Sequence, residues 1–161
     1  MCSPTGDQEV TMTQGVREQL DLPDLNQVGF VVRDMAAALV LYEPMFGPFS
    51  TMDPGPMTYD YRGAQEECNM RLAFGKSGDI EIELIQWLEG GCPHKEFIDA
   101  GGEGMHHLRF IVEDLDRKVK EAQGIGYEAI WRKRYGEGLA VAYLERAGDP
   151  LVLEFFENHH G

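Results

Sequence analysis

GMHHLRFIVED, residues 104–114, is a glycine-led stretch whose alternating side chains predict a β-strand. Because successive side chains of a strand point to opposite faces, Leu108, Phe110 and Val112 share one face and His107 falls on the other. The first face is typical of packing against a core. The second offers an imidazole that packing does not require.

The same plan occurs 80 residues earlier in the chain. FVVRDM, residues 30–35, aligns with FIVEDL, residues 110–115, and Gln27 aligns with His107. Self-similarity at a fixed spacing indicates duplicated modules. We therefore expect an α+β fold of two βαβββ modules, which form a curved mixed sheet with a concave inner face and helices outside.

The first module is read from its alternation and its helix signals. Asp34 is a helix N-cap and Gly47-Pro48 a stop signal, which predicts a helix from Met35 to about Met45. A loop-rich region is expected over Thr51 to Gly63, where proline and glycine are frequent. The predicted strands are Leu25–Val32, Asn69–Phe74 and Ile80–Trp87.

The second module follows a glycine-rich segment with one helical piece, Pro93–Ala100. Its predicted elements are a strand at Met105–Val112, a helix at Leu115–Gln123, and strands at about Tyr127–Lys133, Leu139–Glu145 and Leu151–Phe156. We expect a single domain over residues 25–157, divided into module one (about 25–88), a linker (89–103) and module two (about 104–157). Residues 1–24 form an N-terminal extension, partly mobile, with a short helix at Val16–Leu20. Residues 158–161 are expected to be a disordered tail.

Composition narrows the classes of partner. The chain has 161 residues, 43% of them hydrophobic, and a formal net charge of −14. Such a surface repels phosphate backbones, so we expect no nucleic-acid partner. No run approaches the ~18 apolar residues of a membrane span, and no leader precedes the fold, which predicts a cytoplasmic protein without a membrane partner. The three cysteines lack a C-x-x-C pair and are expected to be reduced.

Four polar side chains fall opposite the apolar rows of four predicted strands: Gln27, Glu83, His107 and Glu154. Each one alone is ordinary, since a strand glutamate is usually solvated and a core histidine is usually hydrogen-bonded. Two carboxylates inside a sheet cavity are costly without a compensating positive charge. A divalent ion with mixed nitrogen and oxygen ligands and no thiolate would supply that charge, and Co, Ni, Zn, Mn and Fe all suit such a site. The pattern leaves both interpretations open, whereas His159 and His160 have no partner for a metal site.

The chain resembles the vicinal oxygen chelate superfamily over about residues 25–157. The resemblance rests on LNQVGFVV (25–32), GDIEIELIQ (78–86), GEGMHHL (102–108) and LVLEFF (151–156). PHKEF (93–97) running into GEGMHH is most similar to the methylmalonyl-CoA epimerase family. The resemblance implies metal ligands at Gln27, Glu83, His107 and Glu154, with His106 as a packing or supporting residue.

The implied ligand set differs among the members of the superfamily. Epimerases usually carry histidine at the first ligand position, whereas this Gln-Glu-His-Glu set is similar to that of glyoxalase I. Gln27 also breaks the two-histidine, one-carboxylate triad of the related extradiol dioxygenases, which argues against oxygen chemistry.

The resemblance also implies a function. We expect a metal-dependent epimerase or racemase that moves a proton at the carbon next to a carbonyl, with Glu83 and Glu154 as the catalytic pair. Glu66 and Glu67 are looser candidates for a further base. A substrate that is an acyl-CoA thioester would require a phosphate-binding patch, and Arg132-Lys133-Arg134 is the only basic cluster, although such a cluster is more typical of a solvated strand edge.

Three alternatives remain open. They are a glyoxalase I-like lactoylglutathione lyase, a racemase of another carbon acid such as an aromatic ketone, and a metal-free protein that sequesters a small molecule. Family members are commonly dimers, which implies a homodimer.

Overall fold

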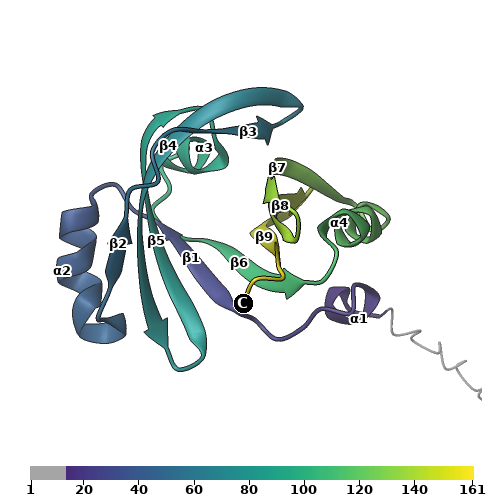
Figure 1. Ribbon diagram of the computed structural model, residues 1–161, viewed down its shortest axis with the longest axis horizontal. Helices are drawn as coiled ribbons and strands as arrows, with labels where there is room; N and C mark the ends of the chain where they lie inside the picture. Colours follow the sequence, from purple (N-terminus) through teal and green to yellow (C-terminus); the bar gives the residue numbers. More distant parts are fainter. Residues whose placement is uncertain (1–13) are drawn as a thin grey trace, which may run out of the picture.

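The computed structural model describes residues 14–161, in which it places four helices and nine strands (Figure 1). The helices are α1 Val16–Gln19, α2 Met35–Phe46, α3 Pro93–Asp99 and α4 Leu115–Gln123. The strands of the first half are β1 Gln27–Val31, β2 Ser50–Met52, β3 Met57–Tyr61, β4 Ala64–Ser77 and β5 Ile80–Gly90. Those of the second half are β6 Gly104–Val112, β7 Tyr127–Gly136, β8 Leu139–Arg146 and β9 Asp149–Asn158.

The strands form one mixed sheet that curves back on itself. Its order is β2-β4-β3-β7-β8-β9-β6-β1-β5, and a further pairing of β4 with β5 joins the two ends into a barrel-like ring. The pairs β1–β5 and β6–β9 are parallel, whereas β1 and β6 pair antiparallel where the two halves meet. The expected α+β class and curved mixed sheet are confirmed. Helices α2 and α4 lie outside the sheet on opposite sides of the molecule (Figure 1).

The region expected to be a loop, Thr51–Gly63, contains strands β2 and β3, so that expectation was wrong. Its prolines Pro54 and Pro56 fall in the gap between the two strands and leave each ladder intact. Both strands pair with the long β4, which also pairs with β5. Strand β3 is joined to β4 by the two-residue turn Arg62-Gly63, in which both residues have positive φ, so this pairing is a local hairpin. The short β2 instead pairs with the later part of β4, at Leu72–Phe74.

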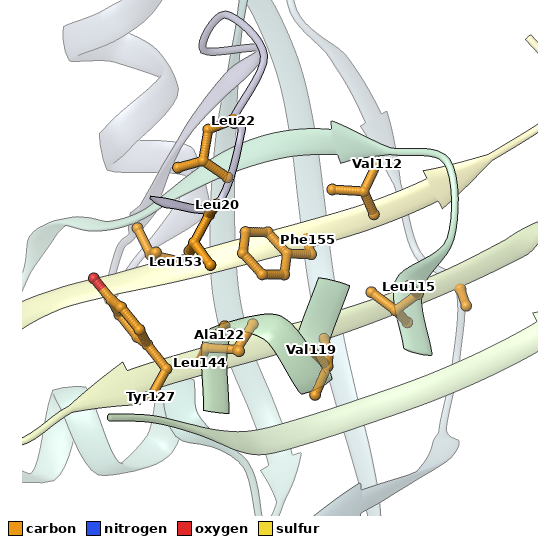
Figure 2. Close-up of a cluster of buried hydrophobic side chains, with 12 residues drawn as sticks. Leu20, Leu22, Val112, Leu115, Val119, Ala122, Tyr127, Leu144, Leu153 and Phe155 are labelled. Atoms are coloured by element: carbon orange, nitrogen blue, oxygen red, sulfur yellow. The ribbon is translucent and has the colours of Figure 1, made fainter. Parts of the chain in front are cut away.

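The outer face of the second half packs beneath α4 and α1. Phe155 of β9 is fully buried there, surrounded by leucines and by Val119 of α4 (Figure 2). Leu20 and Leu22, from α1 and the segment that follows it, enter the same cluster, and Lys118 donates to the Leu20 carbonyl over 2.6 Å. The short helix expected near Val16–Leu20 is therefore present and docked. The partial mobility expected of residues 1–24 stays a prediction, and residues 1–13 lie outside the described residues.

Each strand separates an outer apolar face from an inner face. Ile82 and Leu84 of β5 pack outward with α2, and Glu83 between them points the other way. At the chain end, Asn158 completes β9, and His159 donates its backbone N–H to the carbonyl of Gly138 over 2.8 Å. Within residues 14–161, none of the helices is long and apolar enough to cross a membrane.

Candidate metal centre

Three oxygen-bearing side chains converge on one nitrogen of His107. Its Nε2 lies 2.9 Å from Glu154 Oε2, 3.4 Å from Glu83 Oε2 and 3.3 Å from Gln27 Oε1. All four residues are buried, and His107 and Gln27 are completely inaccessible to solvent. The structure thus brings together the four side chains singled out in the sequence. Their role as ligands stays a prediction.

The strand register places these groups. Gly29 of β1 is paired with Glu83 of β5 on one side and with His107 of β6 on the other. Glu154 of β9 is paired with Arg109, two residues beyond His107. Four adjacent strands therefore deliver one side chain each to the same inner surface, because their residues alternate in step.

A hydrogen-bond network that the sequence did not indicate holds the Gln27 side chain. Its Nε2 donates to Glu81 Oε1 over 2.7 Å, which leaves the amide oxygen facing His107. Arg109 donates to the same Glu81 oxygen over 3.2 Å and to Asn26 Oδ1 over 2.7 Å. The amide oxygen is the atom that would bind a metal, so this network fixes Gln27 in the useful orientation.

His106 departs from simple alternation. The pairing of β1 with β6 shifts after Gly29, so that Phe30 pairs with Met105 and His106 is the extra residue of a β-bulge. His106 does pack against Phe97, with ring centroids 5.1 Å apart, as expected of a packing residue. The bulge also brings its Nδ1 to 3.1 Å from Nδ1 of His107. That contact lets His107 donate from Nδ1 and keep Nε2 free for a metal.

The charges of the centre are strongly coupled. Burial alone would lower the pKa of His107, but Glu154 and Glu83 outweigh it and raise that pKa to about 9. Burial raises the pKa of Glu83, against the opposing effect of His107. Burial, with the nearby His107, lowers the pKa of His106 to about 3, so this ring stays neutral and can accept the hydrogen bond.

The donors fit a divalent metal. Glu83, His107 and Glu154 each offer one ligand atom, and these atoms lie within 4.8 Å of one another. Glu154 Oε2 is buried 2.9 Å from the imidazole Nε2, and no other described residue hydrogen-bonds to it. An imidazole nitrogen with carboxylate and amide oxygens suits Zn, Co, Ni, Mn or Fe.

Gly29 is the residue that leaves room for His107. A Cβ at this position would lie 2.0 Å from Cε1 of the imidazole. We expect Gly29→Ala to displace the ring, to weaken metal binding at least about tenfold, and to cost about 1–3 kcal/mol of unfolding free energy. Metal titration and denaturant unfolding measure the two effects.

The control for this substitution is Gly136→Ala, because a Cβ there meets nothing within 4 Å. We expect that variant to bind metal as the parent protein does. Equal metal affinity in the Gly29→Ala variant would show that the imidazole is not held in the observed place.

Metal affinity should depend on pH with a defined sign. Below a pKa of about 9, the His107 ring carries a proton that an incoming metal must displace. The apparent association constant is therefore expected to rise at least about tenfold per pH unit between pH 6 and 8. A titration with Co²⁺ or Zn²⁺ in a non-chelating buffer measures this slope, and a flat profile would contradict it.

The same proton should affect the stability of the metal-free protein. Because the folded state holds this proton more tightly than the unfolded state does, the metal-free protein should lose stability as the pH rises from about 6.5 towards 9.

A cavity of about 280 Å³ opens over Glu83 and Glu154. Most of its walls are apolar or aromatic: Met52, Pro54, Met57, Tyr59, Met70, Leu72, Phe74, Ile85, Trp131, Leu139, Val141 and Phe156. His94 and Tyr143 also line it and were missed in the sequence. His94 sits at the start of α3, a helix already expected, but its approach to β8 depends on the closed sheet.

The positions of Glu66, Glu67 and the basic cluster do not support the roles expected of them. Glu66 and Glu67 are exposed on β4 and do not line the cavity, so they are not placed to act as a base there. In the basic cluster, Arg132 pairs with Asp116 and Arg134 pairs with Glu157. The two guanidinium groups are therefore already paired with carboxylates, the exposed Asp116 and the buried Glu157.

A sequence model of the Glyoxalase/Bleomycin resistance protein/Dioxygenase superfamily matches residues 26–143. The chain belongs to this superfamily, which is another description of the vicinal oxygen chelate fold, and members of it often use a divalent metal. The uncharacterized protein YqjC of Bacillus subtilis is 25% identical over 136 residues, covering 83% of this chain and 91% of that protein.

The solved structures to which this chain is similar include methylmalonyl-CoA epimerases. That of Mycobacterium tuberculosis is 20% identical with a TM-score of 0.58, covering 85% of this chain and 89% of that one. A Streptomyces coelicolor epimerase variant in complex with 2-nitronate-propionyl-CoA is 18% identical with a TM-score of 0.61, covering 86% and 96%. A hypothetical protein of Bacillus halodurans is 24% identical with a TM-score of 0.61 and the same coverages. These likenesses establish a shared fold.

Proposed function

We propose that this protein is a metal-dependent epimerase or racemase that moves a proton at the carbon next to a carbonyl group. The observation that carries the proposal is the pair of buried carboxylates, Glu83 and Glu154, which come from different halves of the chain and flank His107 beside an apolar cavity. Paired carboxylates in such surroundings are suited to removing and returning a proton.

Each of the four buried polar residues has a role in this proposal. Gln27, Glu83, His107 and Glu154 would hold the metal, which supplies Lewis-acid polarisation of the carbonyl when bound. Burial keeps the pKa of Glu83 above its ordinary value, so this carboxyl group is able to take a proton and release it again. Glu154 faces the same space, and no described group other than His107 contacts its Oε2 as a hydrogen-bond or ion-pair partner. One carboxylate removes the proton from one face of the carbon, and the other returns it to the opposite face.

A second candidate is a glyoxalase I-like lyase that isomerises a hemithioacetal. The donor set itself favours it, because Gln27 stands in the first position where the epimerases usually carry histidine. Turnover of methylglyoxal with glutathione tests this candidate directly, and its absence would remove the lyase.

The acyl-CoA version of the proposal makes a separate prediction. If phosphates of a CoA thioester bound at the basic cluster, Arg132→Ala and Arg134→Ala would raise KM and leave kcat nearly intact. Because both guanidinium groups are engaged by Asp116 and Glu157, we expect KM to change less than about twofold. Steady-state kinetics on a thioester measure this, and a tenfold rise in KM would restore the cluster as a phosphate site.

Solvent deuterium wash-in over a panel of thioesters and ketones tests the proposed reaction class. The metal-loaded protein should place deuterium at the carbon next to the carbonyl in at least one member. Protein that holds no metal after purification without chelators, and exchanges no compound in the panel, would instead favour a protein that sequesters a small molecule.

A further inference from the structure

The cavity over the candidate metal centre has a composition that selects its ligand. Its walls carry three methionines together with Phe74, Trp131 and Phe156. Among the described residues that line it, Arg109 is the one with a permanent positive charge, and Glu81 and Asn26 already bind its guanidinium group. A volume of about 280 Å³ lies just below the ~300–1,000 Å³ typical of small-molecule pockets. The space therefore suits a compact, mainly apolar and uncharged group.

Tyr143 is a buried phenol that lines this cavity. Its ring lies against that of His107, with centroids 4.8 Å apart, and its hydroxyl oxygen is 3.0 Å from Nε2 of His94. Both residues are buried and both line the cavity. Two other phenols of the cavity, Tyr59 and Tyr135, partner each other over 3.4 Å, so they are already engaged.

The tautomer of His94 decides whether the Tyr143 hydroxyl accepts a hydrogen bond from His94 or donates one to it. Nδ1 of His94 is buried and has no hydrogen-bond partner of good geometry among the described residues, although the Cys92 thiol interacts with the same ring. A proton on Nδ1 would therefore be a buried donor with at most a weak sulfur acceptor, which is the costlier arrangement. With the proton on Nε2, His94 donates to the Tyr143 oxygen, and the Tyr143 hydroxyl is left to donate into the cavity.

The phenol of a tyrosine ordinarily keeps its proton throughout the neutral range, because its pKa is about 10. The Tyr143 hydroxyl is therefore a hydrogen-bond donor placed beside the two carboxylates and close to the candidate metal ligand His107.

We propose that the cavity binds a compact, apolar carbonyl compound, and that the Tyr143 hydroxyl, oriented by His94, donates the hydrogen bond that recognises its carbonyl oxygen. The inference rests on the proposed function, since it names the substrate class of the same site. It assigns recognition of the carbonyl to a phenol and recognition of the remaining substituent to methionine and aromatic side chains.

Two probes of nearly equal shape test the assignment. Acetophenone has the carbonyl acceptor, and α-methylstyrene replaces the oxygen with a CH₂ group. Binding of each to the metal-loaded protein is measured by calorimetry. Tyr143→Phe should weaken acetophenone about tenfold and change the binding of α-methylstyrene less than twofold. The control Tyr127→Phe removes the hydroxyl group of a tyrosine in the core under α4 and should change neither affinity.

Three results would overturn the proposal. Equal losses for both probes in Tyr143→Phe would indicate a purely structural role. No loss for either probe would remove the hydrogen bond. Failure of both probes to bind the parent protein at millimolar concentration would remove the apolar ligand class. None of these measurements needs turnover, so they stand apart from the deuterium exchange that tests the reaction class.

The tautomer of His94 gives an independent reading. Nitrogen-15 shifts of the imidazole in the parent protein should show the proton on Nε2. The Nδ1–H tautomer would reverse the hydrogen bond to Tyr143 and would also overturn the proposal.

Discussion

Replacing His107 with alanine is expected to lower the affinity for divalent metal more than about a hundredfold. Its Nε2 is the single nitrogen at which the oxygens of Glu83, Glu154 and Gln27 converge, so its loss removes the common point of the ligand set. The two buried carboxylates would also lose the positive charge that faces them in the metal-free protein. That loss is expected to cost about 3 kcal/mol of unfolding free energy. Metal titration and denaturant unfolding of the metal-free variant measure the two effects.

Two further histidine variants serve as controls for His107→Ala. His160→Ala alters an exposed residue at the chain end and should leave metal affinity unchanged. His106→Ala removes the ring that packs on Phe97 and contacts Nδ1 of His107, so it should mainly cost stability and weaken metal binding only about 10–100-fold. Metal affinity that survives in His107→Ala would place the metal elsewhere in the protein.

The second large effect is expected in Glu83→Gln and Glu154→Gln. Each substitution keeps the shape of the side chain and removes the carboxylate that takes up a proton. We expect each to slow exchange of the proton next to the carbonyl about 10²–10⁴-fold, because that is the usual contribution of a positioned acid or base. Single-turnover deuterium wash-in on the metal-loaded variants measures the rate.

The matched control is Glu66→Gln, which makes the same change at an exposed glutamate of β4. It should retain full exchange. Metal content is measured for each variant, because loss of a ligand and loss of a base both slow the reaction. A variant of Glu83 or Glu154 that keeps metal and also keeps full exchange would exclude that residue as a base.

Much of this site could be predicted from the sequence, because its residues obey strand alternation. Glu83 lies between Ile82 and Leu84, and Glu154 lies between Leu153 and Phe155, so each carboxylate must face away from an apolar row. The repeat then relates His107 to Gln27. Since the strands that carry these two residues, β1 and β6, pair with each other, equivalent places in the sequence are neighbouring places in the fold.

Most of the remaining features depend on contacts between distant parts of the chain. The exception is the hairpin of β3 and β4, which the two-residue turn Arg62-Gly63 joins locally, whereas β2 depends on the later part of β4 for its partner. The bulge at His106 arises from the way β1 meets β6, and it defeats simple alternation at that residue. The approach of His94 to Tyr143 joins α3 to β8, and no local pattern marks it. Sequence periodicity specifies which face a side chain occupies, but it does not specify which side chains meet across the barrel.

The most direct test of the metal-dependent proton transfer is deuterium exchange before and after removal of the metal. The protein as purified is incubated in D₂O with a substrate from the carbonyl panel, then treated with a chelator, and then restored with one equivalent of divalent metal. We predict exchange that falls to background on chelation and returns with the added metal. Exchange that continues unchanged in chelated, metal-free protein would contradict the assignment of Gln27, Glu83, His107 and Glu154 as a catalytic metal centre.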